Sequence, residues 1–238
     1  MVKQYSQLYL EARRALLTTE DQQTASLYAR NLLCHVSGKT QEQVLAARDL
    51  YASEEVCDAV EKAVKRLLTG EPLAYVLGEW DFYGLRLEVN SNVLIPRDDT
   101  CAVTELAIRN ALFFEQAPRI LDLCTGSGCI GLAIASRVKD ARVTLADISK
   151  DALAVAKRNV TATHMSGRVT CIQVDALGPA PAFLGKFDMI VSNPPYVTVA
   201  EMEELAPSVR DFEPHLALVG GEDGLDFYRA ITENYKLA

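Results

Sequence analysis

The sequence predicts an α/β fold: a parallel sheet with helices on both faces, preceded by a small helical domain and a linking β-hairpin. From residue 119 onward, short apolar runs alternate with helical stretches, which is typical of βαβ units. Before residue 78 the apolar residues show helical spacing only. We therefore expect a helical domain at 1–77 and the hairpin plus the α/β domain at 78–238.

The helical part carries recognisable end signals. Thr40-x-x-Gln43 has the form of a capping box, which opens a helix, and Gly38 can close the helix before it. From Ser53 onward apolar residues recur at helical spacing, and Gly70 supplies a stop. These signals predict a small bundle.

The pattern changes over residues 80–95, which read W-D-F-Y-G-L-R-L-E-V-N-S-N-V-L-I. Phe82, Leu85 and Leu87 partly alternate with polar residues, and Asn90-Ser91-Asn92 is a turn signal, so we expect a hairpin here. Beyond it the sequence predicts strands at 119–123, 142–147, 169–174 and 187–192, and helices at about 129–138, 149–164 and 224–236.

Composition narrows the function classes. Forty-nine per cent hydrophobic and 24 per cent charged residues describe an ordinary globular protein. The sequence contains no run of about 18 apolar residues, so we expect no membrane span. The net charge of −8 argues against a large phosphate-binding surface, so we expect no stable nucleic-acid binding. The early charged residues do not suit a signal peptide, and we expect a cytoplasmic protein.

The cysteines and histidines do not predict a metal site. None of the six cysteines forms a Cys-x-x-Cys pair, and the three histidines do not complete a zinc-like cluster. Without a secretory signal, we expect reduced and mostly buried cysteines.

A glycine-rich loop follows the first predicted strand and reads D-L-C-T-G-S-G-C-I-G from Asp122 to Gly131. Glycines let the backbone turn tightly and approach a ligand at a helix N-terminus. Asp147, at the end of the next strand, is placed to hold the two hydroxyls of a ribose, and Asp175, at the end of the third, to meet an adenine edge. These positions predict a site for an adenosine-containing cofactor.

Two cofactors fit this loop. Gly126-x-Gly128-x-x-Gly131 satisfies the dinucleotide fingerprint, so NAD is one candidate. S-adenosylmethionine uses the same arrangement and has no phosphate. The carboxylates near the loop suit a sulfonium cation better than a pyrophosphate, which favours S-adenosylmethionine.

The fourth predicted strand ends in Asn193-Pro194-Pro195-Tyr196. Prolines have no N–H and stiffen the residue before them, so this corner is rich in acceptors and poor in donors. The Asn193 side-chain oxygen and the Pro194 carbonyl can accept both hydrogens of one NH₂ group, and Tyr196 can cover its flat face. We therefore expect Asn193, Pro194 and Tyr196 to be catalytic, and Asn193 to Tyr196 to bind substrate. The nitrogen of a planar amide or base would then face the cofactor's methyl group.

From about Glu71 to its end the sequence resembles the HemK/PrmC family of peptide chain release factor glutamine methyltransferases, and the helical first domain is consistent with this. The matching segments are E-P-L-A-Y-V-L-G (71–78), W-D-F-Y-G (80–84), V-L-I-P-R-D-D-T (93–100), D-L-C-T-G-S-G (122–128), N-P-P-Y (193–196) and E-P-H-L-A-L-V-G-G-E-D-G-L (213–225). N-P-P-Y is shared with adenine-N6 methyltransferases, whereas the segments at Ile95–Arg97 and Glu213-Pro214 are more specific.

The resemblance implies a Rossmann-like class I methyltransferase domain that uses S-adenosylmethionine. It implies transfer of methyl to the side-chain amide nitrogen of the glutamine in the Gly-Gly-Gln motif of release factors, with a helical domain that helps to bind them. Together with the loop analysis, the expected cofactor-binding residues are Asp122, Cys124, Thr125, Gly126, Ser127, Gly128, Asp147, Asp175, Ala176 and Asn193.

Three departures from the family pattern stand out. Asp98 and Cys101 replace a proline and a glutamate of the segment Pro-Arg-Pro-Asp/Glu-Thr-Glu, and Ala176 stands where some members have an aromatic residue. Only four strands precede Ala238, whereas this fold normally has seven, so the fourth strand would expose an apolar edge. We expect a C-terminally truncated or fragmentary domain unless a partner covers that edge.

Three other functions compete with this interpretation. An adenine-N6 nucleic-acid methyltransferase would use the same N-P-P-Y segment but would need a basic groove, which the net charge of −8 does not favour. An NAD-binding oxidoreductase is disfavoured because the N-P-P-Y segment supplies no group for hydride transfer. A truncated, inactive module would bind a release factor without methylating it.

Overall fold

The computed structural model describes residues 2–235 and divides into two compact units, Met1–Leu77 and Gly78–Ala238. The expected outer domain limits at 1 and 238, and the last residue of the helix predicted at 224–236, lie outside the described residues. Each unit has its own core and is described by itself.

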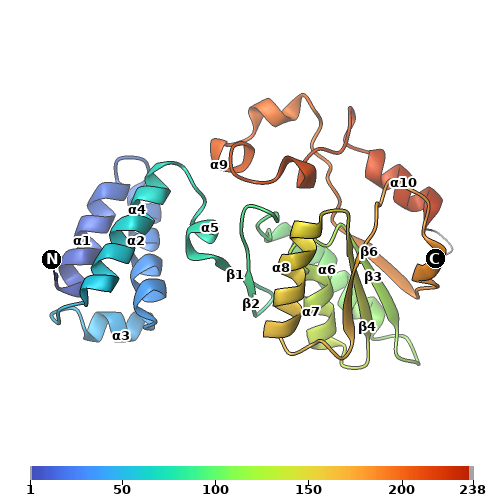
Figure 1. Ribbon diagram of the computed structural model, residues 1–238, viewed down its shortest axis with the longest axis horizontal. Coiled ribbons are helices and arrows are strands. Elements are labelled where there is room, and N and C mark those ends of the chain that lie inside the picture. The colour runs from blue at the N-terminus through green and yellow to red at the C-terminus, as the bar shows by residue number, and fades with distance from the viewer. Residues whose placement is uncertain (1, 236–238) are drawn as a thin grey trace. The chain divides into compact units, whose positions relative to one another are not determined.

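The first unit is a bundle of helices (Figure 1). They are α1 (Tyr5–Leu16), α2 (Gln22–Ser37), α3 (Gln41–Ala46), α4 (Glu54–Leu68) and α5 (Leu73–Leu77). The predicted end signals are confirmed. Thr40 and Gln43 form a capping box at α3, Gly38 closes α2 at φ 65°, and the Ser53 hydroxyl accepts from Val56 N–H at 3.3 Å. Side chains that recur at helical spacing, such as Leu16 and Leu32, fill the space between α1, α2 and α4.

A two-stranded antiparallel hairpin opens the second unit, formed by β1 (Glu79–Phe82) and β2 (Leu85–Glu88). The hairpin is confirmed, but its turn lies at Tyr83-Gly84 and not at Asn90–Asn92. Both turn residues have positive φ (51° and 82°), as a tight two-residue hairpin turn requires. Asn90–Asn92 makes a separate turn, in which Val93 N–H donates to the Asn90 carbonyl at 3.0 Å.

The core of the second unit is a parallel sheet in the order β5-β4-β3-β6, and the predicted fold class is confirmed. Its strands are β3 (Arg119–Leu123), β4 (Arg142–Asp147), β5 (Val169–Gln173) and β6 (Met189–Ser192). Within residues 2–235 the sheet has these four strands, so β5 and β6 are its edges. The order places the end of β6 beside the end of β3, and therefore Asn193 beside the glycine loop.

Helices cover both faces of the sheet (Figure 1). One apolar cluster joins α6 (Asp99–Ala111), α7 (Cys129–Arg137) and α8 (Lys150–Ala162) to one face, and a second joins α10 (Asp226–Asn234) to the other. Short helical turns complete the unit: η1 (Ala182–Leu184), η2 (Glu201–Glu204), α9 (Pro207–Arg210) and η3 (His215–Ala217). The sequence did not predict α6, because its buried face begins with Thr100 and Thr104 instead of aliphatic residues.

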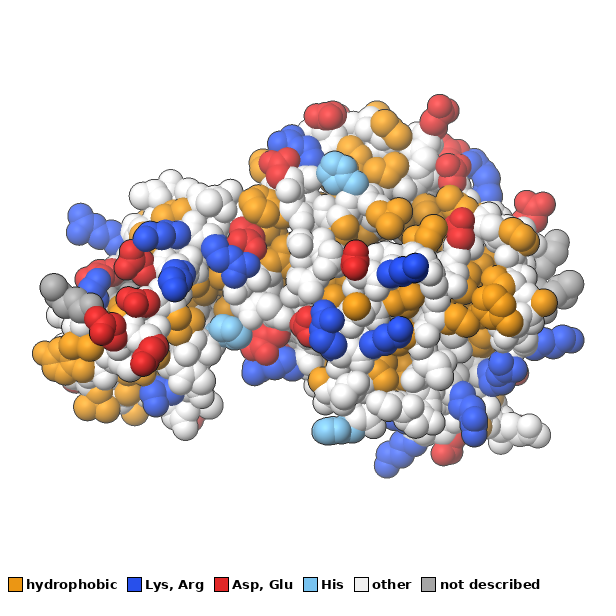
Figure 2. Space-filling view, in the orientation of Figure 1, with side chains coloured by type: hydrophobic (Ala, Val, Ile, Leu, Met, Phe, Trp, Pro, Cys, Tyr) orange, Lys and Arg blue, Asp and Glu red, His pale blue; other side chains and the backbone are white. Residues whose placement is uncertain are grey.

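Acidic and basic side chains are mixed with apolar ones over the face of each unit drawn in Figure 2. None of the helices in the described part of the chain combines the length and apolar character needed to cross a membrane.

Candidate active site

A cavity of about 200 Å³ lies among the loops that follow the strands of the parallel sheet. Of the residues predicted to bind cofactor or substrate, it brings together Cys124, Thr125, Gly126, Ser127, Asp147, Asp175, Ala176, Asn193 and Pro195. Asp122, Gly128, Pro194 and Tyr196 do not line it. The cavity therefore has a wall from each of the four strand ends.

Asp122 lies buried beneath the glycine loop and holds it from below. Its Oδ2 accepts from the Thr125 hydroxyl at 2.6 Å and from Gly131 N–H at 2.9 Å. Oδ1 is buried without a hydrogen-bond partner among the described residues. Burial raises the pKa of Asp122 to about 7, because a carboxylate loses its hydration there.

Gly131 makes the close approach of α7 to the sheet possible. A Cβ at this position would lie 2.3 Å from Leu145 Cδ2 and 3.0 Å from Asp122 Oδ2, which no real side chain allows. At Gly126 an added Cβ would meet nothing within 4 Å, so the loop borders open space at that point. The two glycines thus serve different purposes: one permits packing and the other leaves room for a ligand.

Asp147 is fixed at the end of β4 by backbone donors on both oxygens. Gly126 N–H donates to Oδ2 and Ser149 N–H donates to Oδ1, each at 2.9 Å. Burial raises the pKa of this carboxyl group above its ordinary value. Each oxygen retains a lone pair, so the carboxylate can still accept from a pair of ligand hydroxyls.

The N–H groups of the loop are occupied by protein acceptors. Besides Gly126 and Gly131, Thr125 N–H donates to the Ala146 carbonyl at 3.0 Å, and Gly128 N–H donates to the Thr125 carbonyl at 2.9 Å. A dinucleotide loop offers its N–H groups to a pyrophosphate. These four groups are not available for that purpose, so the loop fits a cofactor without phosphate, namely S-adenosylmethionine.

The two cysteines of the cavity wall are neutral. Cys124 has a left-handed backbone conformation at φ 56°, which turns the chain from β3 into the loop. Burial raises the pKa of the Cys124 thiol, and that of Cys129, to about 12. Both side chains therefore act as small uncharged surfaces.

Asn193 lies on the wall of the cavity after β6. Its Nδ2 donates to the hydroxyl oxygen of Thr100 at 3.4 Å, and no described residue donates to its Oδ1. Thr100 is buried and also lines the cavity. The side-chain oxygen of Asn193 therefore has no donor among the described residues.

The corner at Asn193–Tyr196 is backed by the glycines of the 220–224 segment. A Cβ on Gly220 would lie 2.6 Å from the Pro195 carbonyl oxygen, and one on Gly224 would lie 2.3 Å from the Tyr196 carbonyl oxygen. Val197 and Val219 form a parallel bridge. Val197 N–H donates to the Leu218 carbonyl at 2.9 Å, and Gly220 N–H donates to the Val197 carbonyl at 2.8 Å. These contacts hold the corner rigidly.

Pro194 and Tyr196 lie differently from the other predicted residues. Pro194 is buried between two residues that line the cavity, and its carbonyl accepts from no donor in residues 2–235. Tyr196 is 58% exposed and does not line the cavity. It is accessible to a partner that approaches from solvent.

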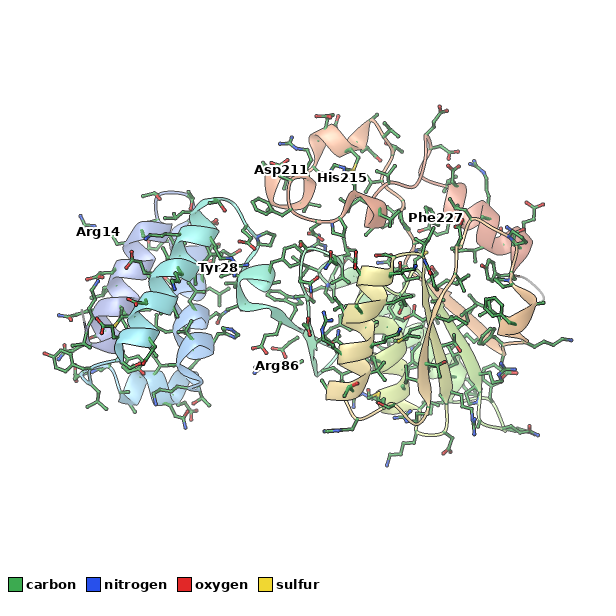
Figure 3. All side chains as sticks on the ribbon, in the orientation of Figure 1. Arg14, Tyr28, Arg86, Asp211, His215 and Phe227 are labelled. Carbon is green, nitrogen blue, oxygen red and sulfur yellow. The ribbon has the colours of Figure 1, made fainter. Side chains whose placement is uncertain are left out.

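Residues beyond those predicted also line the cavity. Arg97 lies just before α6, Thr100 lies in its first turn, and Leu216 belongs to η3. Phe227, labelled in Figure 3 near the start of α10, packs against the apolar cluster on the second face of the sheet. The sequence signal for Arg97 and for Glu213, which contacts it, was their position in the two segments most specific for the resemblance.

Two family models match the chain. The model of the PrmC N-terminal domain matches residues 7–78, and that of the methyltransferase small domain matches residues 104–208. The catalytic domain of hMettl16, solved in complex with MAT2A 3′UTR hairpin 6, is similar in fold with a TM-score of 0.50 and 14% identity. That match covers 79% of this chain and 66% of the solved one.

Curated relatives match over most of the chain. The release factor glutamine methyltransferase of Chlorobaculum tepidum is 41% identical over 212 residues, which are 87% of this chain and 72% of the relative. That of Geobacter sulfurreducens is 39% identical over 225 residues, which are 94% of this chain and 76% of the relative. The sequence similarity therefore extends across both units.

Proposed function

Because the chain belongs to the release factor glutamine methyltransferase family, and its enzymes depend on S-adenosylmethionine, we propose specific roles for the residues around the cavity. The glycine loop from Cys124 to Gly128, supported by Asp122, would lie against the cofactor. Asp147 would accept from the ribose hydroxyls, and Asp175 and Ala176 would border the adenine. Asn193 would contact both the cofactor and the substrate.

The substrate we propose is the glutamine side chain of the Gly-Gly-Gln motif of a peptide chain release factor. The single observation that supports this most strongly is the free Oδ1 of Asn193 on the wall that also contains the glycine loop and Asp147. An NH₂ group has two donors, and Oδ1 with the Pro194 carbonyl would accept both. Tyr196 would cover the planar amide from the solvent side, and Pro195 would stiffen the corner.

The chemistry then depends on orientation. S-adenosylmethionine supplies a methyl group on a positively charged sulfur. An amide nitrogen is a poor nucleophile because its lone pair is delocalised. Asn193 and Pro194 hold both amide hydrogens, which points the nitrogen toward the cofactor, and their acceptor dipoles strengthen as positive charge grows on nitrogen. The described lining residues include no histidine, in keeping with a reaction that needs no strong base before attack.

We propose that the helical unit contributes to binding the release factor. We also propose that the protein acts in the cytoplasm, where release factors terminate translation. We propose no nucleic-acid substrate, because the net charge of −8 opposes a large phosphate-binding surface.

Mass spectrometry of a release factor incubated with the protein and S-adenosylmethionine tests this function. We expect a mass increase of one methyl group on the glutamine of the Gly-Gly-Gln peptide, and its loss with Asn193→Ala. Methyl transfer to adenine in DNA or RNA instead would support the nucleic-acid alternative. Binding of release factor without transfer to any acceptor would support an inactive binding module.

A further inference from the structure

The four strands of the parallel sheet begin at the edge opposite the cavity, and a basic residue stands at the start of each one. In the order of the strands across the sheet they are Arg168 before β5, Arg142 in β4, Arg119 in β3 and Lys186 before β6. Arg119 and Arg142 are register partners, and Val143 N–H donates to the Arg168 carbonyl at 2.9 Å. Because neighbouring strands lie about 4.8 Å apart, these residues form a row about 14 Å long.

The segments that lead into the strands, 112–119, 137–142, 163–168 and 184–188, together make up what we call the strand-entry edge. This edge has a local excess of positive charge, although the net charge of the whole chain is −8. Figure 2 shows Lys and Arg side chains along the lower rim of the second unit. The basic residues of the edge are Arg119, Arg137, Lys139, Arg142, Arg168 and Lys186, and its acidic residues are Glu115, Asp140 and Asp188.

The arginines of the strand-entry edge differ from the other arginines of the second unit, because they have no carboxylate partner. Arg119, Arg137, Arg142 and Arg168 form no ion pair with any residue in the range 2–235. Each remaining arginine between residues 78 and 235 is paired with an Asp or Glu side chain; these are Arg86, Arg97, Arg109, Arg158, Arg210 and Arg229. The unpaired guanidinium groups keep their donors for an anion that comes from outside the chain.

Two of these guanidinium groups are held in place by the fold. Arg119 Nη2 donates to the Leu184 carbonyl at 3.3 Å, and its guanidinium lies 5.2 Å from the centroid of the Phe187 ring. Arg168 Nη1 donates to the Val138 carbonyl at 3.3 Å. Both groups retain further N–H donors, since a guanidinium has five. Side chains that are already ordered lose less entropy on binding, so the row is prepared for a ligand.

Exposed phenylalanines accompany the row of cations. Phe113, in the segment that leads into β3, is 84% exposed, and Phe183, in η1, is 69% exposed. Phe183 directly precedes Leu184, whose carbonyl accepts from Arg119. Cations that follow a phosphate backbone, with aromatic rings on which bases stack, are the two features of surfaces that bind single-stranded nucleic acid. An acidic peptide would pair with the cations but has no planar base for the rings.

We propose that the strand-entry edge binds a short segment of single-stranded nucleic acid, with phosphates along the row from Arg168 to Lys186 and a base stacked on Phe183. The nucleic acid is a bound partner and not a methyl acceptor, because a strand of five residues, about 16 Å, separates this edge from the cavity. The net charge of −8 opposes a large phosphate-binding surface, and a row of four cations is a small one. Binding is therefore weak and strongly dependent on salt.

Fluorescence anisotropy of the whole chain with labelled dodecauridylate, in about 50 to 200 mM KCl, tests this proposal. We expect the logarithm of the association constant to fall against the logarithm of the salt concentration with a slope of about −2 to −3, since each neutralised phosphate of a single strand contributes about −0.7. Arg142→Gln/Lys186→Gln removes two exposed cations whose side chains bond no described residue, so the variant should fold. Its slope should be less steep by about 1.4, and its affinity at about 100 mM KCl should be about 10- to 30-fold lower.

Phe183→Ala separates stacking from charge. We expect it to weaken binding about fivefold or more and to leave the salt slope unchanged, because stacking on a ring releases no counterions. Arg210→Gln/Arg229→Gln is the matched control: it makes the same change in net charge at arginines outside the edge, and it should weaken binding less than about twofold. S-adenosylhomocysteine binding, measured by calorimetry, should be the same in all these variants, so this test is independent of the proposed function.

Three results would overturn the proposal. The first is no binding of dodecauridylate at about 50 mM KCl, and the second is equal weakening by the two double variants. The third is equally tight binding of dodecaglutamate with the same loss in Arg142→Gln/Lys186→Gln, which would assign the edge to an acidic protein segment instead.

Discussion

Asn193 Nδ2 donates to the hydroxyl oxygen of buried Thr100 at 3.4 Å, which leaves Asn193 Oδ1 without a donor in the described part of the chain. An asparagine amide has two ends of almost equal shape and opposite hydrogen-bonding character. The contact with Thr100 therefore bears directly on which end faces the substrate. It joins the start of α6 to the corner after β6.

Replacing Thr100 tests whether this contact orients Asn193. Thr100→Val has nearly the same shape but no hydroxyl, so the amide would lose its partner, and we expect kcat to fall about tenfold, the value of one hydrogen bond. Thr100→Ser keeps the hydroxyl and should keep most of the activity. Steady-state kinetics on a release factor, with calorimetry for S-adenosylhomocysteine, separates this effect from cofactor binding, which should change little.

Thr104→Val is the matched control for that series. It removes another buried hydroxyl from α6, one that donates to the Thr100 carbonyl at 2.8 Å. An equal fall in kcat with Thr104→Val would mean that α6 as a whole, and not the contact with Asn193, is responsible.

Gly131→Ala should destabilise the second unit. The added Cβ would lie 2.3 Å from Leu145 Cδ2 and 3.0 Å from Val143 Cγ1, both on β4 and both in the core. Overpacking of this kind costs about 1–3 kcal/mol of unfolding free energy. Urea unfolding measures it, and Gly167→Ala, where a Cβ meets nothing within 4 Å, should stay within about 0.5 kcal/mol of wild type. Similar values for the two variants would contradict the tight packing of α7 on the sheet.

Asp122 makes stability depend on pH. Burial raises its pKa in the folded state to about 7 from an ordinary value of 3.8, so between these values the folded state binds more protons than the unfolded one. The free energy of unfolding therefore falls as pH rises through this window, and the part of it that depends on the protonation of Asp122 is lost above about pH 7. Asp122→Asn does not titrate, so its unfolding free energy relative to wild type should rise between pH 5 and pH 8, by about 2–4 kcal/mol at 1.36 kcal/mol per pKa unit.

Urea unfolding of both proteins at the two pH values checks this. Asp140→Asn, at an exposed aspartate, serves as the control and should follow wild type. A difference between Asp122→Asn and wild type that is the same at pH 5 and pH 8 would show that Asp122 does not titrate in this range.

The sheet and most of the helices could be predicted because their signals are local. The end signals at Thr40 and Gly38 lie within a few residues of the helix ends that they mark, and the strand predicted at 119–123 has the observed bounds Arg119–Leu123. The hairpin turn was misplaced because Tyr83 takes positive φ, which a tyrosine rarely does, whereas Asn90–Asn92 has the composition of a turn. Local composition there favoured the wrong one of two real turns.

The site was predictable to the extent that strand ends define it. Asp147 ends β4 and Asn193 follows β6, on either side of β3 in a parallel sheet, so topology alone brings them to one edge. The contact between Arg97 and Glu213 spans 116 residues, and no periodicity or spacing connects the two. The exposure of Tyr196 was equally outside the reach of sequence, because it depends on how the 197–224 segment packs against the corner.

Asn159 ties three elements together, and its replacement should affect both stability and cofactor affinity. From a buried position on α8, its Nδ2 donates to the Glu88 carbonyl at 3.0 Å and to the Ser127 carbonyl at 2.9 Å. Its Oδ1 accepts from Glu88 N–H at 2.7 Å. One side chain thus links α8 and the hairpin strand β2 to the glycine loop.

Asn159→Ala would leave these three backbone groups without their partner, and we expect a loss of about 2–4 kcal/mol in unfolding free energy, since each net hydrogen bond contributes about 1 kcal/mol. Because the Ser127 carbonyl is no longer held, the loop should become less ordered and S-adenosylhomocysteine affinity should fall several-fold by calorimetry. Thr161→Ala, which removes an exposed hydroxyl from the same helix, should change neither quantity. Lost stability with unchanged cofactor affinity would show that Asn159 supports the fold alone and leaves the loop geometry to Asp122 and Asp147.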